Sequence, residues 1–365
     1  MNRTISVIFR AIPLVLAAVC FSYGAYVYSG GSSSGYFIAG NVLMALTAIC
    51  FALFTTAATI IRQLTGTYRA LWHWLLPLSG YAVAAATVSY GLYVFATDHT
   101  NQGYVAGHNV TGIGLIAACV STVADASRHF TLIPRNSHGT AADGPPPEAY
   151  GRRTGLALTA VPLGCALVAY GWALYSLASG SGMANFIGGL VLTGLAGICA
   201  SVMALVATVE RQTRNVFGEA ERFAWSWWVV AFGTLNLILG IVVLVFSSRP
   251  YAVAPGYILI GLGLICFSIL SKVLLLALVW RREFALANRI PLIPITTCLT
   301  CLFMAAFLFE AVLTNSNFFI PARVLIGLGA VCFTLFSIVS ILEAGTSTPS
   351  EAQAPSQVHP VPGAG

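Results

Sequence analysis

Stretches of about twenty apolar residues recur along this chain, separated by short segments that hold most of its polar and basic residues. An α-helix needs about 20 apolar residues to cross a bilayer core about 30 Å thick. The pattern therefore predicts an all-α, polytopic membrane protein with ten transmembrane helices. Their expected ranges are 8–29, 37–61, 71–96, 104–126, 155–178, 185–209, 225–247, 255–280, 291–314 and 319–342.

The composition agrees with a lipid environment and indicates a topology. Of the 365 residues, 58% are hydrophobic and 8% are charged, whereas soluble domains carry roughly 25% charged residues. Most arginines lie in connections that would share one side of the membrane with both termini. Because Lys and Arg accumulate on the cytoplasmic side, both termini are predicted to be cytoplasmic. The net charge of +6 then reflects topology, and no nucleic-acid partner is expected.

Small residues recur at similar positions in every second predicted helix, which indicates internal repeats. We call the small residue that opens each of these helices its anchor. Successive anchors are 67, 82, 67 and 66 positions apart. The pattern predicts one transmembrane domain, 1–345, made of five parallel two-helix repeats of about 67 residues. The anchors are Gly40, Gly107, Gly189, Gly256 and Ala322, and the repeats are expected at 8–62, 71–128, 154–211, 225–282 and 288–343.

Two segments fall outside this repeat. The one long insertion between repeats lies within residues 129–153, and three consecutive prolines there predict a Pro-rich cytoplasmic loop. Residues 346–365 are rich in Pro, Ser, Ala and Gly. Such a composition buries little apolar surface, so this tail is predicted to be disordered.

A second set of glycines lies five positions after the anchors. Since glycine lets helix backbones approach closely, we expect a packing face. A phosphate-binding loop would need a preceding strand and a Gly-Lys-Ser/Thr ending, and the only lysine of the chain is Lys272. The predicted packing glycines, from both sets, are Gly40, Gly107, Gly189, Gly256, Gly112, Gly194, Gly261 and Gly327.

One face of each anchored helix is small and carries hydroxyl groups. Positions 1, 5, 8, 12, 15 and 19 after each anchor share this face at helical spacing, and it includes Thr55, Ser201 and Ser337. Two interpretations remain open. The face packs against other helices, which small and hydroxyl residues favour, or five such helices form a pseudo-fivefold ring around a narrow polar path.

Ionisable residues inside a membrane are costly and mark pairs or paths. Lys272 lies deep in the eighth predicted helix, where it would snorkel to the surface, pair with another group or line a path. Glu310 and Arg323, near the outer ends of neighbouring helices, are expected to form a salt bridge. His108 is predicted at the outer mouth, either as an ordinary interfacial residue or as a sensor of external acidity. Further polar candidates at this level are Asn41 and Tyr257.

Motifs for enzyme chemistry are weak in this chain. "GSSSG" at 31–35 matches a hydrolase pattern but lacks the strand-turn-helix context and a histidine partner. "CLTC" at 298–301 lies in an apolar helix, and the nine cysteines resemble small hydrophobic residues. His, Cys and carboxylate residues do not show metal-site spacing. The sequence therefore predicts a protein that is not an enzyme and holds no metal or cofactor.

Four stretches carry a resemblance to a known family: "YVAGHNVTGIGLIAACVSTVA", "SKVLLLALVWRR", "LANRIPLIP" and "ARVLIGLGAVCFTLFSIVSILEAG". They resemble the YhiM-like family of bacterial inner-membrane proteins, and the likeness extends from the amino end to residue 345. The resemblance implies a multi-pass inner-membrane protein linked to tolerance of acid stress. It supplies no catalytic residues that could be transferred.

Two functions remain open. The first is a contribution to acid-stress resistance through passive or ion-coupled permeation or transport of a small solute or ion, because no ATP-binding loop is present. The second is a structural membrane protein that binds lipid or a partner subunit without transport. In both, the lipid bilayer is the first partner.

Overall fold

A computed structural model describes residues 3–64, 71–129, 150–180, 182–281 and 284–346. Within these ranges the protein is all-α and has no strand, and ten helices are long and apolar enough to cross a membrane. The predicted fold class and the ten spans are confirmed. The long helices are α1 (Arg3–Ser29), α2 (Ser34–Leu64), α3 (Trp72–Thr97), α4 (Asn101–Ser127), α5 (Arg152–Ala178), α6 (Met183–Thr213), α7 (Glu219–Phe246), α8 (Val253–Arg281), α10 (Leu292–Val312) and α11 (Phe319–Thr346).

Three short helices complete the described chain: η1 (Pro250–Ala252), α9 (Phe284–Ala287) and η2 (Ser316–Phe318). Most of the predicted loop at 129–153 and nearly all of the predicted tail at 346–365 lie outside the described residues. The helix α5 begins inside the predicted loop, at Arg152.

The long helices form two layers, an inner ring and an outer ring. The inner helices are α2, α4, α6, α8 and α11, and 67–94% of their membrane windows is buried inside the protein. The outer helices are α1, α3, α5, α7 and α10, with only 22–33% buried. Each inner helix contacts two inner neighbours, and contacts between α11 and α2 close the ring. The apolar side chains of the outer helices are therefore left to face lipid.

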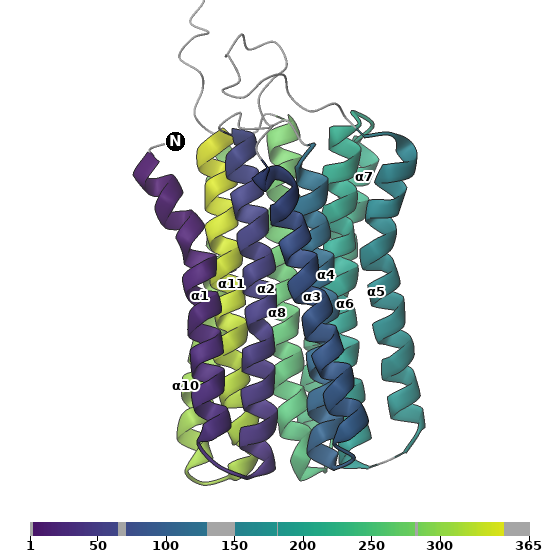
Figure 1. Ribbon diagram of the computed structural model, residues 1–365, viewed down its shortest axis with the longest axis vertical. Helices are drawn as coiled ribbons and strands as arrows, with labels where there is room; N and C mark the ends of the chain where they lie inside the picture. Colours follow the sequence, from purple (N-terminus) through teal and green to yellow (C-terminus); the bar gives the residue numbers. More distant parts are fainter. Residues whose placement is uncertain (1–2, 65–70, 130–149, 181, 282–283, 347–365) are drawn as a thin grey trace, which may run out of the picture.

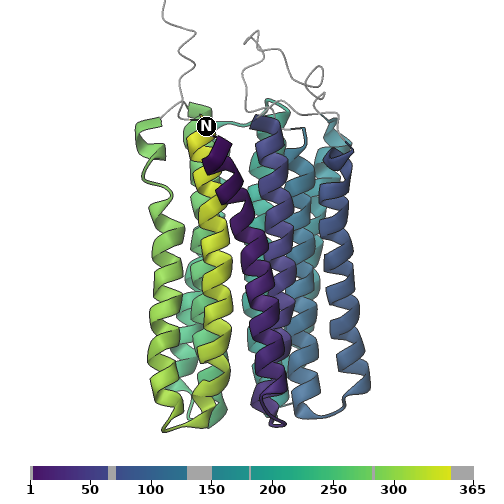
Figure 2. The same ribbon diagram turned by 60° about the vertical axis from the view of Figure 1, so that its left-hand side comes forward.

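Successive helices pair into hairpins, each with one outer and one inner member: α1–α2, α3–α4, α5–α6, α7–α8 and α10–α11. Figure 1 shows the N-terminus at the upper end and the tight connections within hairpins at the lower end. We call these the terminal end and the loop end. The turned view in Figure 2 shows α1 and α11 side by side, so the first and last hairpins are neighbours.

Within a hairpin, the anchor glycines allow the inner helix to approach its outer partner. A Cβ atom built on Gly40 would lie 2.7 Å from the Cβ of Tyr28, and one on Gly107 would lie 2.8 Å from the Cβ of Phe95. Gly189 and Gly256 meet leucine side chains of their own outer helices in the same way. The close approach requires the absence of a side chain.

Between inner helices, one pairing recurs around the ring. Glycine on one helix receives two leucines from the next inner helix, and a Cβ atom built there would lie 2.4–2.6 Å from one of them. The pairing even joins the last inner helix to the first. The four contacts are Gly112 with Leu192 and Leu195, Gly194 with Leu259 and Leu262, Gly261 with Leu325 and Leu328, and Gly327 with Leu43 and Leu46.

Candidate functional site: an axial cavity with a buried lysine

Two narrow cavities lie along the axis of the inner ring, in which the centre of a water molecule has about 30 and 20 Å³ of space. The wall of the first cavity is formed by positions 6, 9, 13 and 16 after the anchors and that of the second by positions 16, 20 and 23, and all five inner helices contribute. These positions follow helical spacing and share one face. The inner helices therefore enclose the axis. Every residue that lines the two cavities belongs to an inner helix.

The small hydroxyl-bearing face does not line this axis. It turns toward neighbouring helices: Ser268 of α8 bonds Thr297 of α10 through their hydroxyl oxygens at 2.6 Å, and Thr122 of α4 accepts a bond from Tyr81 of α3. The hypothesis of a polar path lined by that face is wrong, because other positions of the inner helices line the axis. The packing interpretation describes the face correctly, because its small side chains let helices approach.

The axial wall consists of three successive levels of aliphatic side chains, which we call the aliphatic barrier. It extends over seven residue steps of helix, about 10 Å along the axis. Barrier positions are aliphatic on every inner helix that lines the cavity. From the loop end inward, the levels are Leu46, Leu195, Leu262 and Leu328; then Ile49, Ile116, Ile198, Ile265 and Val331; then Leu53, Val120, Val202, Ile269 and Leu335.

Lys272 lies at the next level toward the terminal end and lines both cavities. It is 3% exposed. No hydrogen bond or ion pair joins it to any residue that the structure describes, and neither cavity wall contains a carboxylate. The end of α8, at Arg281, is nine residues away, about 13 Å of helix. The expected structural pairing and snorkelling of Lys272 are therefore absent from this structure.

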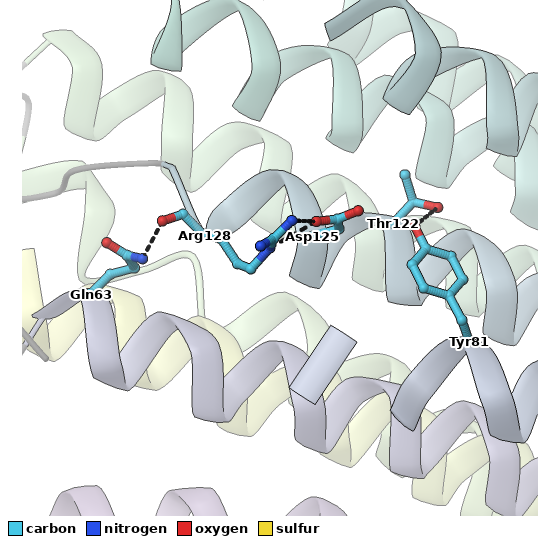
Figure 3. A network of polar contacts seen from close by, with 5 residues as sticks. All are labelled: Gln63, Tyr81, Thr122, Asp125 and Arg128. Atoms are coloured by element: carbon cyan, nitrogen blue, oxygen red, sulfur yellow. Dashed lines mark hydrogen bonds and ion pairs between the residues drawn. The ribbon is translucent and has the colours of Figure 1, made fainter. Parts of the chain in front are cut away.

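A polar network braces the cavity wall at the terminal end (Figure 3). Gln63 of α2 lines the second cavity and donates to the carbonyl of Arg128 at the end of α4. The guanidinium of Arg128 bonds Asp125 and stacks 3.8 Å from the ring centre of Trp74 on α3. These contacts connect α2, α3 and α4 beside the second cavity, and so they fix the positions of these helices at the terminal end.

His108 is buried and does not lie at an open mouth. Its Nδ1 atom is 2.8 Å from the carbonyl oxygen of Tyr104. Phe95, Tyr104 and Trp172 surround the imidazole, with ring centres 4.0–5.0 Å away. The expected outer mouth is not open at His108, because the side chain lies two turns inside α4 and neighbouring rings enclose it.

Glu310 and Arg323 do not form the predicted salt bridge. Arg323 lies with its Cζ atom 3.5 Å above the ring centre of Phe319 and donates to the Phe319 carbonyl at 3.2 Å. Glu310 is exposed, and no described residue forms an ion pair with it. The arginine turns back along its own helix, where Phe319 lies one turn away, and it contacts α10 at the ring of Phe309, whose centre is 5.1 Å from its Cζ atom.

Asn41 and Tyr257 contact neighbouring elements instead of the axis. The Asn41 side chain donates to the Phe37 carbonyl and accepts a bond from the Tyr90 hydroxyl at 2.8 Å. Tyr257 is half-buried, and its ring lies 6.4 Å from that of Phe318. Both contacts join one hairpin to the next, so these residues contribute to packing between hairpins.

Replacing Tyr90 with phenylalanine is expected to destabilise the protein by about 1 kcal/mol, because the buried Asn41 oxygen loses its only donor from another helix. Thermal unfolding in detergent measures this as a lowered Tm. Tyr93→Phe is the matched control, since Tyr93 is exposed on the same helix. Equal Tm values for the two variants would contradict a structural role for the Asn41–Tyr90 contact.

The cysteines and the two short motifs show no assembled reactive site in the described part of the chain. All nine cysteines are free, and eight of them are buried in helices. No group of three His, Cys, Asp or Glu side chains there is placed to hold a metal ion. Serines of the "GSSSG" segment lie at the turn between α1 and α2. Lys272 is thus the one sequence candidate that the structure places on the axis.

Sequence reasoning missed the axial wall and the role of Gln63 in it. The wall positions were readable, because leucine, isoleucine and valine recur at 6, 9 and 13 after each anchor. Aliphatic residues are common on every face of a membrane helix, so this pattern did not distinguish the axial face from the others. Only ring closure distinguishes an axial face from a lipid-facing one.

Comparisons with known proteins agree with the membrane fold. A family described as "Protein of unknown function (DUF2776)" matches residues 1–347. The chain is 50% identical over 348 residues to the protein named "Inner membrane protein YhiM" of Escherichia coli (strain K12), which covers 95% of this chain and 99% of that protein. No solved structure matches the chain with significance.

Proposed function

This chain belongs to the DUF2776 family of multi-pass inner-membrane proteins, and on that premise we propose that it is a passive or ion-coupled permeation element for a small solute or ion. One observation carries the proposal: the only lysine of the chain lies buried on the axis of a closed ring of helices. Helix packing alone does not require a charge there. An apolar side chain would fill the same space without a desolvation penalty.

The aliphatic barrier makes the described structure a closed state of this path. Narrow apolar constrictions exclude water and ions, and they gate channels by dewetting. The polar groups of the axial wall lie on the terminal side of the barrier, namely Lys272, Thr56, Gln63 and Ser127. Permeation would therefore require the ring to widen at the barrier, while the terminal-end cavity receives the solute.

We further propose that the terminal end faces the cytoplasm. Three inner helices carry arginine in the last turn at this end: Arg62 on α2, Arg211 on α6 and Arg281 on α8. An excess of arginine marks the cytoplasmic side. In this orientation the lysine cavity lies on the cytoplasmic side of the barrier, and the resemblance described above suggests that the path serves the cell under acid stress.

A structural role is the second candidate, and the aliphatic barrier itself favours it. A sealed bundle would bind lipid or a partner subunit through its outer helices. It predicts that no ion passes under any condition and that changes at Lys272 alter nothing except stability.

Ion and solute flux in reconstituted vesicles tests the proposal. The purified chain is reconstituted, and movement of chloride, protons, potassium and glycerol is followed with dyes or by light scattering, at neutral and at acidic pH. Permeation predicts that at least one of them moves faster than in protein-free vesicles. If none moves, even after the barrier is made polar as described in the Discussion, the structural alternative holds.

A further inference from the structure

The amino group of Lys272 lies in a cavity that provides no counter-ion. Its side chain is 3% exposed and lines both axial cavities. Apart from Lys272 and Thr56, the lining of the first cavity is aliphatic. The second cavity adds Gln63 and Ser127, and no described residue in either lining is acidic. Desolvating an ammonium without a partner costs several kcal/mol.

The other polar groups of the same cavity are neutral. Thr56 already donates its hydroxyl hydrogen to the Ala52 carbonyl at 3.0 Å. Gln63 donates through its amide nitrogen to the Arg128 carbonyl. Ser127 is buried, and its hydroxyl makes no hydrogen bond to any residue that the structure describes. When Lys272 is protonated, the cavity offers a positive charge and the Ser127 hydroxyl to a ligand that accepts hydrogen bonds.

We propose that the cavity around Lys272 binds a small monovalent inorganic anion, such as chloride or nitrate. The inference rests on the proposed function, because it names the substrate class of the same path. A bound anion supplies the missing counter-charge and accepts hydrogen bonds from the available donors. Lysine in a pore favours anions and repels cations.

The aliphatic surroundings select against strongly hydrated anions. An ion that enters this cavity leaves most of its water, and the wall replaces little of it beyond the donors named above. The desolvation cost rises steeply with charge, so sulfate and phosphate dianions are disfavoured. A single lysine also balances one negative charge only, and Lys272 is the sole lysine of the chain.

Anion-dependent thermal stability tests the binding site without relying on transport. Purified protein is unfolded in chloride, nitrate, gluconate and sulfate salts at equal ionic strength. A ligand that binds the folded state alone raises the Tm, so chloride and nitrate are expected to raise it by about 2 °C or more over gluconate and sulfate. Equal Tm values in all four salts would overturn the proposal.

Variants at the cavity separate specific binding from a general salt effect. Lys272→Met should abolish the rise, and Lys272→Arg should retain it because the positive charge remains. Leu276→Met is the matched control, since Leu276 lines the same cavity and carries no charge. Size-exclusion profiles confirm that each variant is folded. A rise that persists in Lys272→Met contradicts the assignment of the site.

Flux through an opened barrier separates failure of this inference from failure of the proposed function. With the barrier variant Ile198→Asn in vesicles, chloride should pass at least tenfold faster than potassium, and added Lys272→Met should remove the preference. If potassium passes as fast as chloride, permeation stands and the anion site is wrong. If salt stabilises the protein through Lys272 but no ion passes, the anion site stands and permeation is wrong.

Discussion

Replacing Ile198 with asparagine is expected to increase ion flux through reconstituted vesicles by about tenfold or more, which corresponds to a barrier lowered by about 1.4 kcal/mol. Ile198 lies at the middle level of the aliphatic barrier and is almost fully buried. An amide at this level offers hydrogen bonds to water where the wall otherwise offers none. Since apolar constrictions close by dewetting, a hydrated side chain favours the open, wet state.

Ile198→Val is the matched control for this prediction. Valine keeps the level aliphatic and removes one methylene, so the flux should stay near that of the unaltered protein. Thermal unfolding of both variants shows whether the ring is intact. If Ile198→Asn is folded and passes no more ions than Ile198→Val, the barrier does not lie on a permeation path.

Replacing Gly194 with leucine is expected to cause the largest loss of stability, about 3 kcal/mol, through overpacking of the inner ring. A Cβ atom at Gly194 would already lie 2.6 Å from the Cδ1 atom of Leu262. Leu262 lines the axis, so it cannot move aside without entering the cavity. The measurement is the Tm in detergent, which should fall by about 6 °C or more.

Gly171→Leu is the control for the ring substitution. Gly171 lies on the outer helix α5, is exposed, and has no atom within 4 Å of a built Cβ. Leucine there faces lipid and favours the helix, so the Tm should not fall. Comparable losses in the two variants would show that the glycine pairing of the inner ring contributes nothing specific.

The spans were predictable because a bilayer imposes one length and one polarity on each helix. All ten lie where the apolar runs lie, although α2 and α6 extend several residues further, to Leu64 and Thr213. Hydropathy does not register such extensions, since they carry arginine beyond the apolar core. The close approach of glycines was likewise readable, because a missing side chain has few other uses in a membrane helix.

The arrangement of side chains around the axis was not predictable in the same way. Which face of α6 or α8 turns inward depends on closure of the ring between α11 and α2, a contact between the two ends of the chain. Arg323 illustrates a second limit: Glu310 was its nearest carboxylate in the sequence, yet the arginine lies over Phe319. An aromatic ring one helical turn away offered a contact within the same helix.

The central claim is that the axis of the inner ring is the path through the membrane, and thiol blocking of the opened protein tests it most directly. Leu335→Cys and Leu302→Cys are each made in the Ile198→Asn protein, which retains its native cysteines as the baseline. Leu335 lines the axis, whereas Leu302 is exposed on the outer helix α10. A charged thiol reagent should abolish the flux of the Leu335→Cys protein alone. Unchanged flux in that protein, or equal loss in both, would contradict the account.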